Sequence, residues 1–357
     1  MKDFQQKVEQ LRKLLRAKQL DGLLIGQQKN FSWLTGGRSF VNLGTERAVG
    51  TIFVSLDTAV LFASNIEAQR LIDEEVQAEF AEVKVFPWHL PGRLEQLLAD
   101  WTEGKQVLWD SELEAELSVM RSILSDDEQV RIRSLARETA EALEQTARQI
   151  SIGETEYEIA ARLAANCIAR GIEPIVNLVG TDQRIFQRRH PLPTTKRLER
   201  YAMLVVGGRR QGQIVSCTRL VHFGQPPAEL ERRLQAVATV DAALILSTVP
   251  GKQFEQLFAT LQEVYQTVGF ANEWQHHHQG GLSGYLSREQ LLLPGLVREV
   301  QANQAFAWNP SISGVKSEDT ILVTANGPEI LTFTGQYPTV EAVWNGSKLA
   351  RPGILVR

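Results

Sequence analysis

The residues most able to do chemistry in this chain are its histidines. Five of the six lie in the second half of the sequence: His190, His222, His276, His277 and His278. An imidazole titrates near neutral pH, so it can transfer protons or bind a metal ion. The two cysteines, Cys167 and Cys217, cannot form a disulfide framework or a thiolate zinc cluster, and they fit a reducing compartment. Any metal site would therefore have to use histidines and carboxylates.

Three of these histidines are consecutive, and a group of cations lies around His190. On an extended segment, alternate side chains share a face, so we expect His278 to face the same way as His276. The basic residues between positions 184 and 210, where Glu199 is the one acid, are Arg184, Arg188, Arg189, Lys196, Arg197, Arg200, Arg209 and Arg210. They favour a carboxylate-bearing ligand, because arginine binds carboxylates through two hydrogen bonds. A solvated basic surface is the alternative.

The composition excludes several classes of partner. With 38 Lys and Arg against 42 Asp and Glu, the net charge is −4, which argues against binding to nucleic acid or to a membrane surface. No window approaches the roughly 18 apolar residues that a membrane-spanning helix needs. The chain begins with Phe4, Val8, Leu11 and Leu15 at helical spacing among charges, which predicts a surface helix and not a signal peptide. We therefore expect a cytoplasmic globular protein.

Two domains are predicted to position the chemistry, over residues 1–125 and 126–357, since 357 residues are enough for two cores. The first domain alternates helices with short apolar strands, which predicts a small α/β layer domain. Its strands are expected at 22–26, 48–54, 58–63 and 84–86, with a helix over 67–75. The boundary falls at Ser125, where capping residues open a long helix over 129–150.

The second domain repeats one order of elements. Thr155 and Glu158 form a capping box that opens a helix, and a strand follows at 201–206. Later, a helix starts after Pro226, a second helix spans 254–268, and a strand follows at 304–309. Two helix–helix–strand halves predict an α+β domain with pseudo-twofold symmetry and a pocket between the halves. Coincidental regularity is the alternative.

Short sequence strings now point to a family. Near the start stand DGLLI at 21–25 and NFSWLTG at 30–36, and later come, in order, VVG at 205–207, SCTR at 216–219, HQGG at 278–281, NP at 309–310 and EDT at 318–320. With the domain order, these strings make the chain resemble the aminopeptidase P, prolidase and creatinase superfamily. The resemblance implies a creatinase-like N-terminal α/β domain, a pita-bread domain after it, and a hydrolase of the Xaa-Pro aminopeptidase or prolidase type.

The resemblance also implies where two divalent metal ions would bind. The superfamily's Asp, Asp, His, Glu and Glu ligands fall here on Val205, Ser216, His278, Asn309 and Glu318. Only His278 and Glu318 can bind metal, and one carboxylate with one imidazole is too little to offset the desolvation of two ions. We therefore predict no dinuclear metal site and no cofactor. A shift of the second position to Cys217, where a thiolate could bind one ion, breaks the match at Thr218 and Arg219.

The residues that remain in the expected pocket favour acid–base chemistry. Creatinase acts without metal, and by resemblance to it His190 takes the acid–base role together with His278 and Glu318. Tyr285 stands where the superfamily has a second histidine and could donate a hydrogen bond. The other candidates for substrate binding are Ser216, Arg219, His276, Arg288, Trp308, Asn309 and Lys316. An acyl-enzyme on Ser216 or Cys217 is disfavoured, because neither lies in a G-x-S-x-G turn.

Three functions follow from these observations. The leading hypothesis is a metal-independent hydrolase of a small, anionic compound: a carboxylate-bearing amide, an amidino compound or a Pro-containing dipeptide. The alternatives are a non-catalytic protein that binds peptides or proteins, and a metalloaminopeptidase with a rearranged site. Because superfamily members commonly dimerise, we also expect a homodimer in which Arg38 of one subunit reaches the other's pocket and binds a substrate carboxylate.

Overall fold

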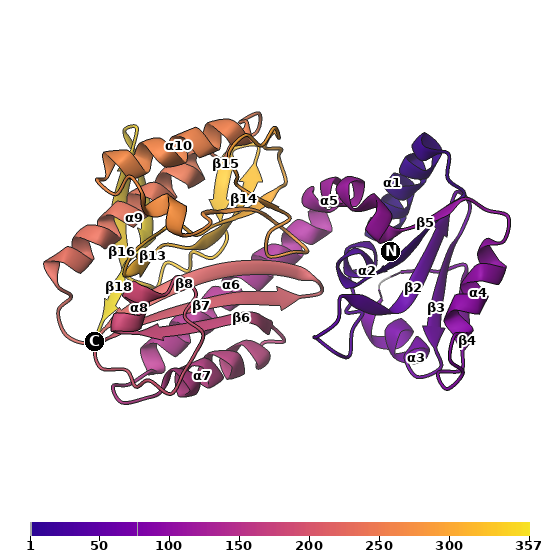
Figure 1. The fold of residues 1–357 in the computed structure, drawn as a ribbon, viewed down its shortest axis with the longest axis horizontal. Coiled ribbons are helices and arrows are strands. Elements are labelled where there is room, and N and C mark those ends of the chain that lie inside the picture. The colour runs from indigo at the N-terminus through magenta and orange to yellow at the C-terminus, as the bar shows by residue number, and fades with distance from the viewer. Residues whose placement is uncertain (1, 77) are drawn as a thin grey trace. The chain divides into compact units, whose positions relative to one another are not determined.

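The computed structural model describes residues 2–76 and 78–357 and divides into two units (Figure 1). One unit ends at Arg121 and includes the short segment 211–213. The other consists of Ser122–Arg210 and Ile214–Arg357. Each unit has its own sheets and its own core, so each is described by itself.

The first unit is an α/β domain built on one five-stranded sheet. In chain order its elements are α1 (Lys2–Lys18), β1 (Gly22–Gln27), α2 (Gln28–Thr35), β2 (Arg47–Ser55), β3 (Ala59–Ser64), α3 (Ala68–Arg70), β4 (Glu82–Phe86), α4 (Arg93–Thr102), β5 (Val107–Trp109) and α5 (Glu114–Ser122). The strand order is β4-β3-β2-β1-β5, with the two outer strands parallel to their neighbours and the inner pairs antiparallel. The apolar stripe predicted for the first helix is buried.

The helix predicted over 67–75 has a different form in the structure. Only α3 is α-helical, and a wider π-type turn follows over Leu71–Glu75. This turn ends where the carboxylate of Glu75 pairs with both Arg70 and Arg38.

The first half of the second unit packs two helices on an antiparallel sheet. The elements are α6 (Asp126–Gln149), α7 (Glu156–Ile168), β6 (Glu173–Thr181), α8 (Gln183–Gln187), β7 (Tyr201–Arg210) and β8 (Gln213–His222). Capping boxes open both long helices, at Ser125 with Glu128 and at Thr155 with Glu158, as the sequence predicts for the second. Strands β6, β7 and β8 are consecutive in a sheet that β18 (Ile354–Val356) completes by pairing in parallel with β8.

The second half repeats this arrangement with its own helix pair and sheet. The helices are α9 (Ala228–Ser247) and α10 (Phe254–Thr267), and the main strands are β9 (Gly280–Ser283), β10 (Gln290–Leu291), β11 (Ala305–Trp308), β14 (Asp319–Thr324) and β15 (Gly327–Ile330). The strand order is β10-β9-β11-β14-β15, entirely antiparallel. Two short hairpins complete the unit: β12 (Ser311–Ile312) with β13 (Val315–Lys316), and β16 (Thr339–Trp344) with β17 (Ser347–Pro352). The predicted pita-bread architecture is confirmed.

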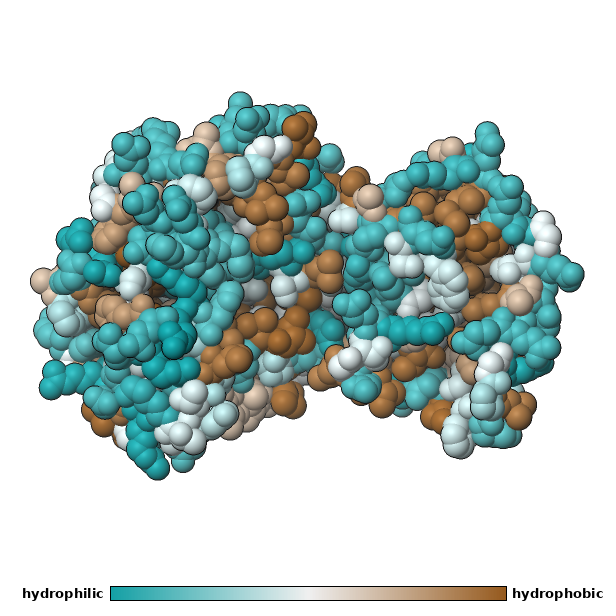
Figure 2. Space-filling view, viewed as in Figure 1, coloured by the Kyte–Doolittle hydropathy of each residue, from teal (hydrophilic) through white to brown (hydrophobic). Residues whose placement is uncertain are grey.

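The surface in Figure 2 places apolar residues in small groups between hydrophilic ones. Among the described residues, no helix has both the length and the apolar character that crossing a membrane requires.

Candidate functional site

A cavity of about 320 Å³ lies within the second unit. Strands from both halves supply its walls, together with the loop after α8 and the loop between β9 and β10. Its lining residues are Val176, Leu178, His190, Val205, Val206, Ser216, His278, Ser287, Arg288, Asn309, Lys316 and Glu318. Most of the predicted site residues therefore lie in one cavity, although long stretches of sequence separate them.

The donor atoms in this cavity do not fit a pair of divalent metal ions. All five positions that the resemblance assigns to metal ligands line the cavity: Val205, Ser216, His278, Asn309 and Glu318. Among the lining residues described in the structure, Glu318 is the sole carboxylate, whereas two hard divalent ions need several. In addition, two cations already occupy this carboxylate.

Glu318 is the electrostatic centre of the cavity. Its Oε2 lies 2.8 Å from Nζ of Lys316 and accepts a hydrogen bond of 2.6 Å from Oγ1 of Thr218. Its Oε1 lies 3.5 Å from Nη2 of Arg288. Burial alone would raise the pKa of the Glu318 carboxyl, but Lys316 and Arg288 outweigh burial and hold that pKa below its ordinary value. Glu318 is therefore ionised at neutral pH.

Three histidine rings lie together at this cavity, and two of them, His190 and His278, line it. Nε2 of His277 lies 3.0 Å from Nε2 of His190, and the ring centroids of His277 and His278 are 4.6 Å apart. Burial lowers the pKa of all three imidazoles, most strongly at His277 and to about 4 at His278, and Lys316 lowers them further. All three rings are therefore neutral at pH 7.

The structure corrects the predicted orientation of His276. Residues Glu273–His276 form a turn of 3₁₀ helix, so the alternation of an extended segment does not apply. His276 is exposed, and His277 is the buried neighbour that contacts His190. The consecutive histidines were a visible signal for this site, but the sequence alone did not show which of them faces His190.

Buried polar atoms without a partner mark the cavity as a place for a ligand. Within the described residues, no hydrogen bond is made by Oδ1 of Asn309, Nδ1 of His278 or Nε of Arg288. All three residues line the cavity. Since an unsatisfied buried polar atom costs about 1–3 kcal/mol, these atoms favour a bound molecule that hydrogen-bonds to them.

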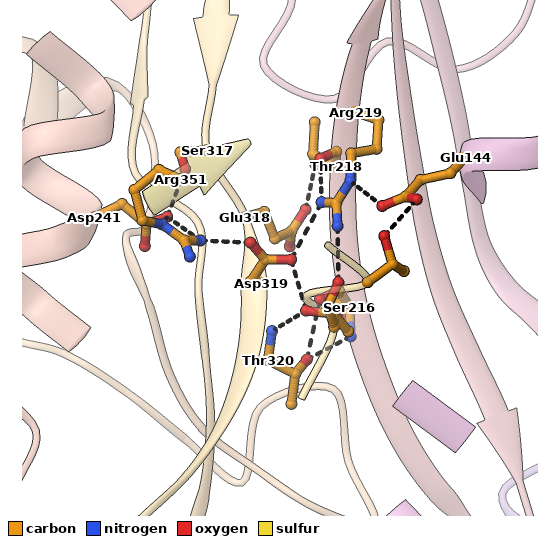
Figure 3. Close-up of polar contacts among 12 residues, drawn as sticks. Glu144, Ser216, Thr218, Arg219, Asp241, Ser317, Glu318, Asp319, Thr320 and Arg351 are labelled. Carbon is orange, nitrogen blue, oxygen red and sulfur yellow. Dashed lines mark hydrogen bonds and ion pairs between the residues drawn. The ribbon is translucent and has the colours of Figure 1, made fainter. Parts of the chain in front are cut away.

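Arg219 was expected to bind substrate, but it lies outside the cavity in a buried network of charges (Figure 3). Its Nε donates to Oε1 of Glu144 and its Nη1 to Oδ1 of Asp319, each at 3.1 Å. Arg351 then links Asp319 to Asp241. The network joins α6, β8, α9, β14 and β17, so Arg219 connects the elements around the site and does not line the cavity.

Trp308 and Tyr285 are also absent from the cavity lining. The indole of Trp308 is fully buried, stacks on Phe306 and donates from Nε1 to Oγ1 of Thr248 at 3.1 Å. The hydroxyl of Tyr285 donates to Oε1 of Glu128 at 2.6 Å, at the start of α6. Both side chains therefore support the core beside the site, and neither lines the cavity in which they were expected.

Arg38 belongs to the first unit, where Glu75 holds it. Its Nε lies 3.0 Å from Oε1 of Glu75, and its Nη2 lies 2.7 Å from the same oxygen. Its contact with the pocket of a second subunit remains a prediction.

Cys217 does not have the environment of a nucleophile. The side chain is fully buried, and burial raises the pKa of its thiol well above the ordinary value. A thiolate at this position is therefore strongly disfavoured at neutral pH, which opposes both an acyl-enzyme on Cys217 and a thiolate metal ligand there.

The fold and the cavity define a pita-bread protein with a creatinase-like N-terminal domain. Residues 130–325 match metallopeptidase family M24, and residues 7–139 match the creatinase/prolidase N-terminal domain. The chain belongs to metallopeptidase family M24.

A relative resembles the chain over most of its length, and two solved structures share its fold. An Xaa-Pro dipeptidase of Pyrococcus horikoshii is 23% identical over 352 residues, which cover 92% of this chain and 97% of the relative. The crystal structure of a prolidase from the same species has a TM-score of 0.76 at 20% identity and covers 92% of this chain and 98% of its own. The structure of an Xaa-Pro dipeptidase from Bacillus anthracis has a TM-score of 0.78 at 18% identity and covers 99% of this chain and 100% of its own.

Proposed function

We propose that this chain is a metal-independent member of its family, which binds a small carboxylate-bearing amide, an amidino compound or a Pro-containing dipeptide and hydrolyses it. One observation carries this proposal. The carboxylate available to a metal among the described lining residues, Glu318, is already paired with Lys316 and Arg288. A divalent ion would have to displace both cations or lie beside them.

The charge of the cavity suits an anionic ligand. Because the histidines are neutral, the charged lining residues are the cations Lys316 and Arg288 and the anion Glu318. The net charge of the cavity is therefore one positive charge, which a single carboxylate would balance. The unpaired Nε of Arg288 is a donor for that carboxylate. Val176, Leu178 and Val205 offer an apolar wall for the remainder of a small ligand.

The histidines supply the chemistry that hydrolysis of an amide or amidine needs. In our proposal, a water proton passes to Nδ1 of His278 while the water oxygen bonds to the substrate carbon. The C–N bond then breaks as the leaving nitrogen takes the proton back from the imidazolium. His190 donates a hydrogen bond to the substrate oxygen or nitrogen that gains negative charge, and the anionic Glu318 stabilises the imidazolium.

Metal analysis and a substrate screen test this function together. Protein purified without chelator should contain no stoichiometric divalent ion, and two ions per chain would overturn the proposal in favour of a metalloaminopeptidase with a rearranged site. A screen of guanidino compounds, amides and prolyl dipeptides should find turnover that His190→Ala abolishes. The matched control is His276→Ala, because His276 belongs to the same histidine run but is exposed and outside the cavity.

A non-catalytic binding protein is the second candidate, and the state of Glu318 favours it. Three groups, Lys316, Arg288 and Thr218, already engage this carboxylate, which limits its use as a base. If dipeptides raise the melting temperature but are never turned over, the chain is a binding protein at the same cavity.

A further inference from the structure

His277 connects the cavity to a chain of hydrogen bonds behind it. Its Nε2 lies 3.0 Å from Nε2 of His190, and its Nδ1 lies 3.2 Å from Oγ of Ser311. His277 is buried, whereas His190 is exposed and lines the cavity. The ring of His277 thus stands between a buried serine and the histidine that faces a ligand.

The direction of these hydrogen bonds follows from the two partners of the Ser311 hydroxyl, Arg189 and His277. Nη1 of Arg189 lies 3.2 Å from Oγ of Ser311, and a guanidinium can only donate. An ion pair with Glu273 holds this guanidinium, and the Ser313 amide donates to the same carboxylate at 3.1 Å. Oγ of Ser311 therefore accepts from Arg189, and among the described residues Nδ1 of His277 is its one partner that can accept a hydrogen. Donation of the Ser311 hydroxyl hydrogen to Nδ1 of His277 is thus the arrangement that satisfies this hydroxyl.

A second set of contacts holds the backbone of His277. The side-chain amide of Gln279 donates to the backbone carbonyl of His277, and the hydroxyl of Tyr265 donates to Oε1 of Gln279 at 2.7 Å. The backbone amide of Ser311 donates to the same hydroxyl oxygen at 3.1 Å. His277 and Ser311 are therefore tied to each other through Tyr265 as well as directly.

We propose that His277 is a positioning residue that holds His190 in the tautomer protonated at Nδ1. Because Nδ1 of His277 accepts from Ser311, the hydrogen of this neutral ring is on Nε2. Only one hydrogen fits between two nitrogens 3.0 Å apart, so His277 donates it and Nε2 of His190 accepts it. His190 then carries its own hydrogen on Nδ1 and presents a hydrogen-bond donor to the ligand.

This inference rests on the proposed function, because it takes His190 as a residue that contacts the ligand. It assigns the hydrogen-bond donor role to His190 and the proton-acceptor role to His278. His190 would act as a fixed donor, because its second nitrogen is occupied by His277. His278, whose Nδ1 has no partner among the described residues, would remain the proton acceptor. The opposite tautomer of His190 would point a lone pair at the ligand and could not stabilise developing negative charge.

Nitrogen-15 NMR of the histidine rings tests the tautomer without any ligand or turnover. Couplings between the ring nitrogens and ring protons distinguish the protonated nitrogen from the bare one. His222 is an internal reference, because its Nδ1 lies 2.7 Å from the carbonyl oxygen of Gly224 and so must carry a hydrogen. We expect His190 to show the same pattern as His222 in the wild-type protein, with His190→Ala identifying its signals.

Two variants then test the role of His277. His277→Phe keeps an aromatic ring but removes the donor, so His190 should lose its preference for Nδ1–H. Ser311→Ala removes the donor to Nδ1 of His277 and should weaken the preference of His190 for Nδ1–H. If His277→Phe disturbs the fold, which a change in the His222 reference signals would reveal, Ser311→Ala serves as the test. A control, His276→Phe, should leave the tautomer of His190 unchanged.

Three results would overturn the inference. The first is a wild-type His190 protonated on Nε2, and the second is an unchanged His190 tautomer in both variants while the His222 signals stay as in the wild type. The third is uptake of one Zn²⁺ per chain by the rings of His190, His277 and His278. Because none of these measurements uses a substrate, a correct tautomer together with an absence of ligand binding would reject only the proposed function.

Discussion

Lys316 and Arg288 act on every titratable side chain that lines the cavity. They hold the pKa of Glu318 below its ordinary value, and, after burial, they lower the pKa of His190 and His278. At neutral pH the cavity therefore combines an ionised carboxylate, two cations and neutral imidazoles. This combination suits a ligand with one negative charge and a proton-transfer step that begins with neutral histidine.

Replacing Lys316 should move the histidine titrations. Lys316→Met removes a positive charge but keeps the ring environment largely apolar, so the pKa of His278 should rise from about 4, and that of His190 should rise with it. Histidine proton shifts followed against pH measure both values. Lys348→Met on the exposed hairpin β16–β17 is the matched control and should change neither. Unchanged pKa values in Lys316→Met would show that burial alone sets them.

His277 should make the protein less stable in mild acid. Burial keeps its folded-state pKa far below the ordinary 6.5, whereas the unfolded chain binds a proton below that pH. The stabilisation is therefore complete above about pH 6.5 and decreases as the pH falls, by up to about 1.4 kcal/mol per pH unit for one group. Urea denaturation at several pH values should show a shallower acid slope in His277→Gln than in His276→Gln. Equal slopes would contradict this assignment.

The sequence predicts which motifs lie around the cavity, but it does not predict which side chains of each motif line it. His190, Ser216, His278, Asn309 and Glu318 come together because each motif has a fixed place in the fold. Motif membership does not say which way a side chain points. Trp308 directly precedes the cavity residue Asn309, and Arg219 follows Ser216 by three positions, but both side chains enter the core.

Helices and turns whose ends depend on residues close together in the sequence could be predicted. The capping box of Thr155 and Glu158 opens α7 where the sequence places it, because both partners are three residues apart. The turn Glu273–His276 could not be predicted in this way. Its Glu273 carboxylate binds Arg189 and the Ser313 amide, two groups that only the folded chain brings near.

The buried charge network should be the main polar support of the elements around the cavity. Arg219→Met would leave Glu144 and Asp319 with fewer partners in the core, so the free energy of unfolding should fall by about 3–5 kcal/mol. Denaturant unfolding measures this loss. The control is Arg133→Met, which breaks an exposed pair between α6 and Glu329 and should cost at most about 1 kcal/mol. Similar losses in both variants would refute a special role for the network.

At the scale of the whole molecule, the homodimer and its cytoplasmic location remain predictions. Light scattering should give twice the chain mass of 40.0 kDa if the chain dimerises. In that case Arg38→Gln should weaken binding of carboxylate ligands, whereas Arg16→Gln, on an exposed face of α1, should not. A mass of one chain would overturn the expectation that Arg38 reaches the pocket of a second subunit, and with it the expectation that Arg38 binds a carboxylate there.

The thermal stability of the intact protein should respond to carboxylates and not to metals. Glycyl-proline should raise the melting temperature, because a ligand at 100 times its Kd stabilises the folded state by about 2.7 kcal/mol. Its C-terminal amide, which lacks the carboxylate, should raise it less, and Mn²⁺ or Co²⁺ should leave it unchanged. The combined variant Val205→Asp, Ser216→Asp and Asn309→Glu restores carboxylates at three cavity positions, so it should gain stabilisation by Mn²⁺ or Co²⁺. Equal stabilisation of the wild-type protein and the variant by these ions would contradict the prediction. It would show that the cavity binds metal despite the neutral residues Val205, Ser216 and Asn309.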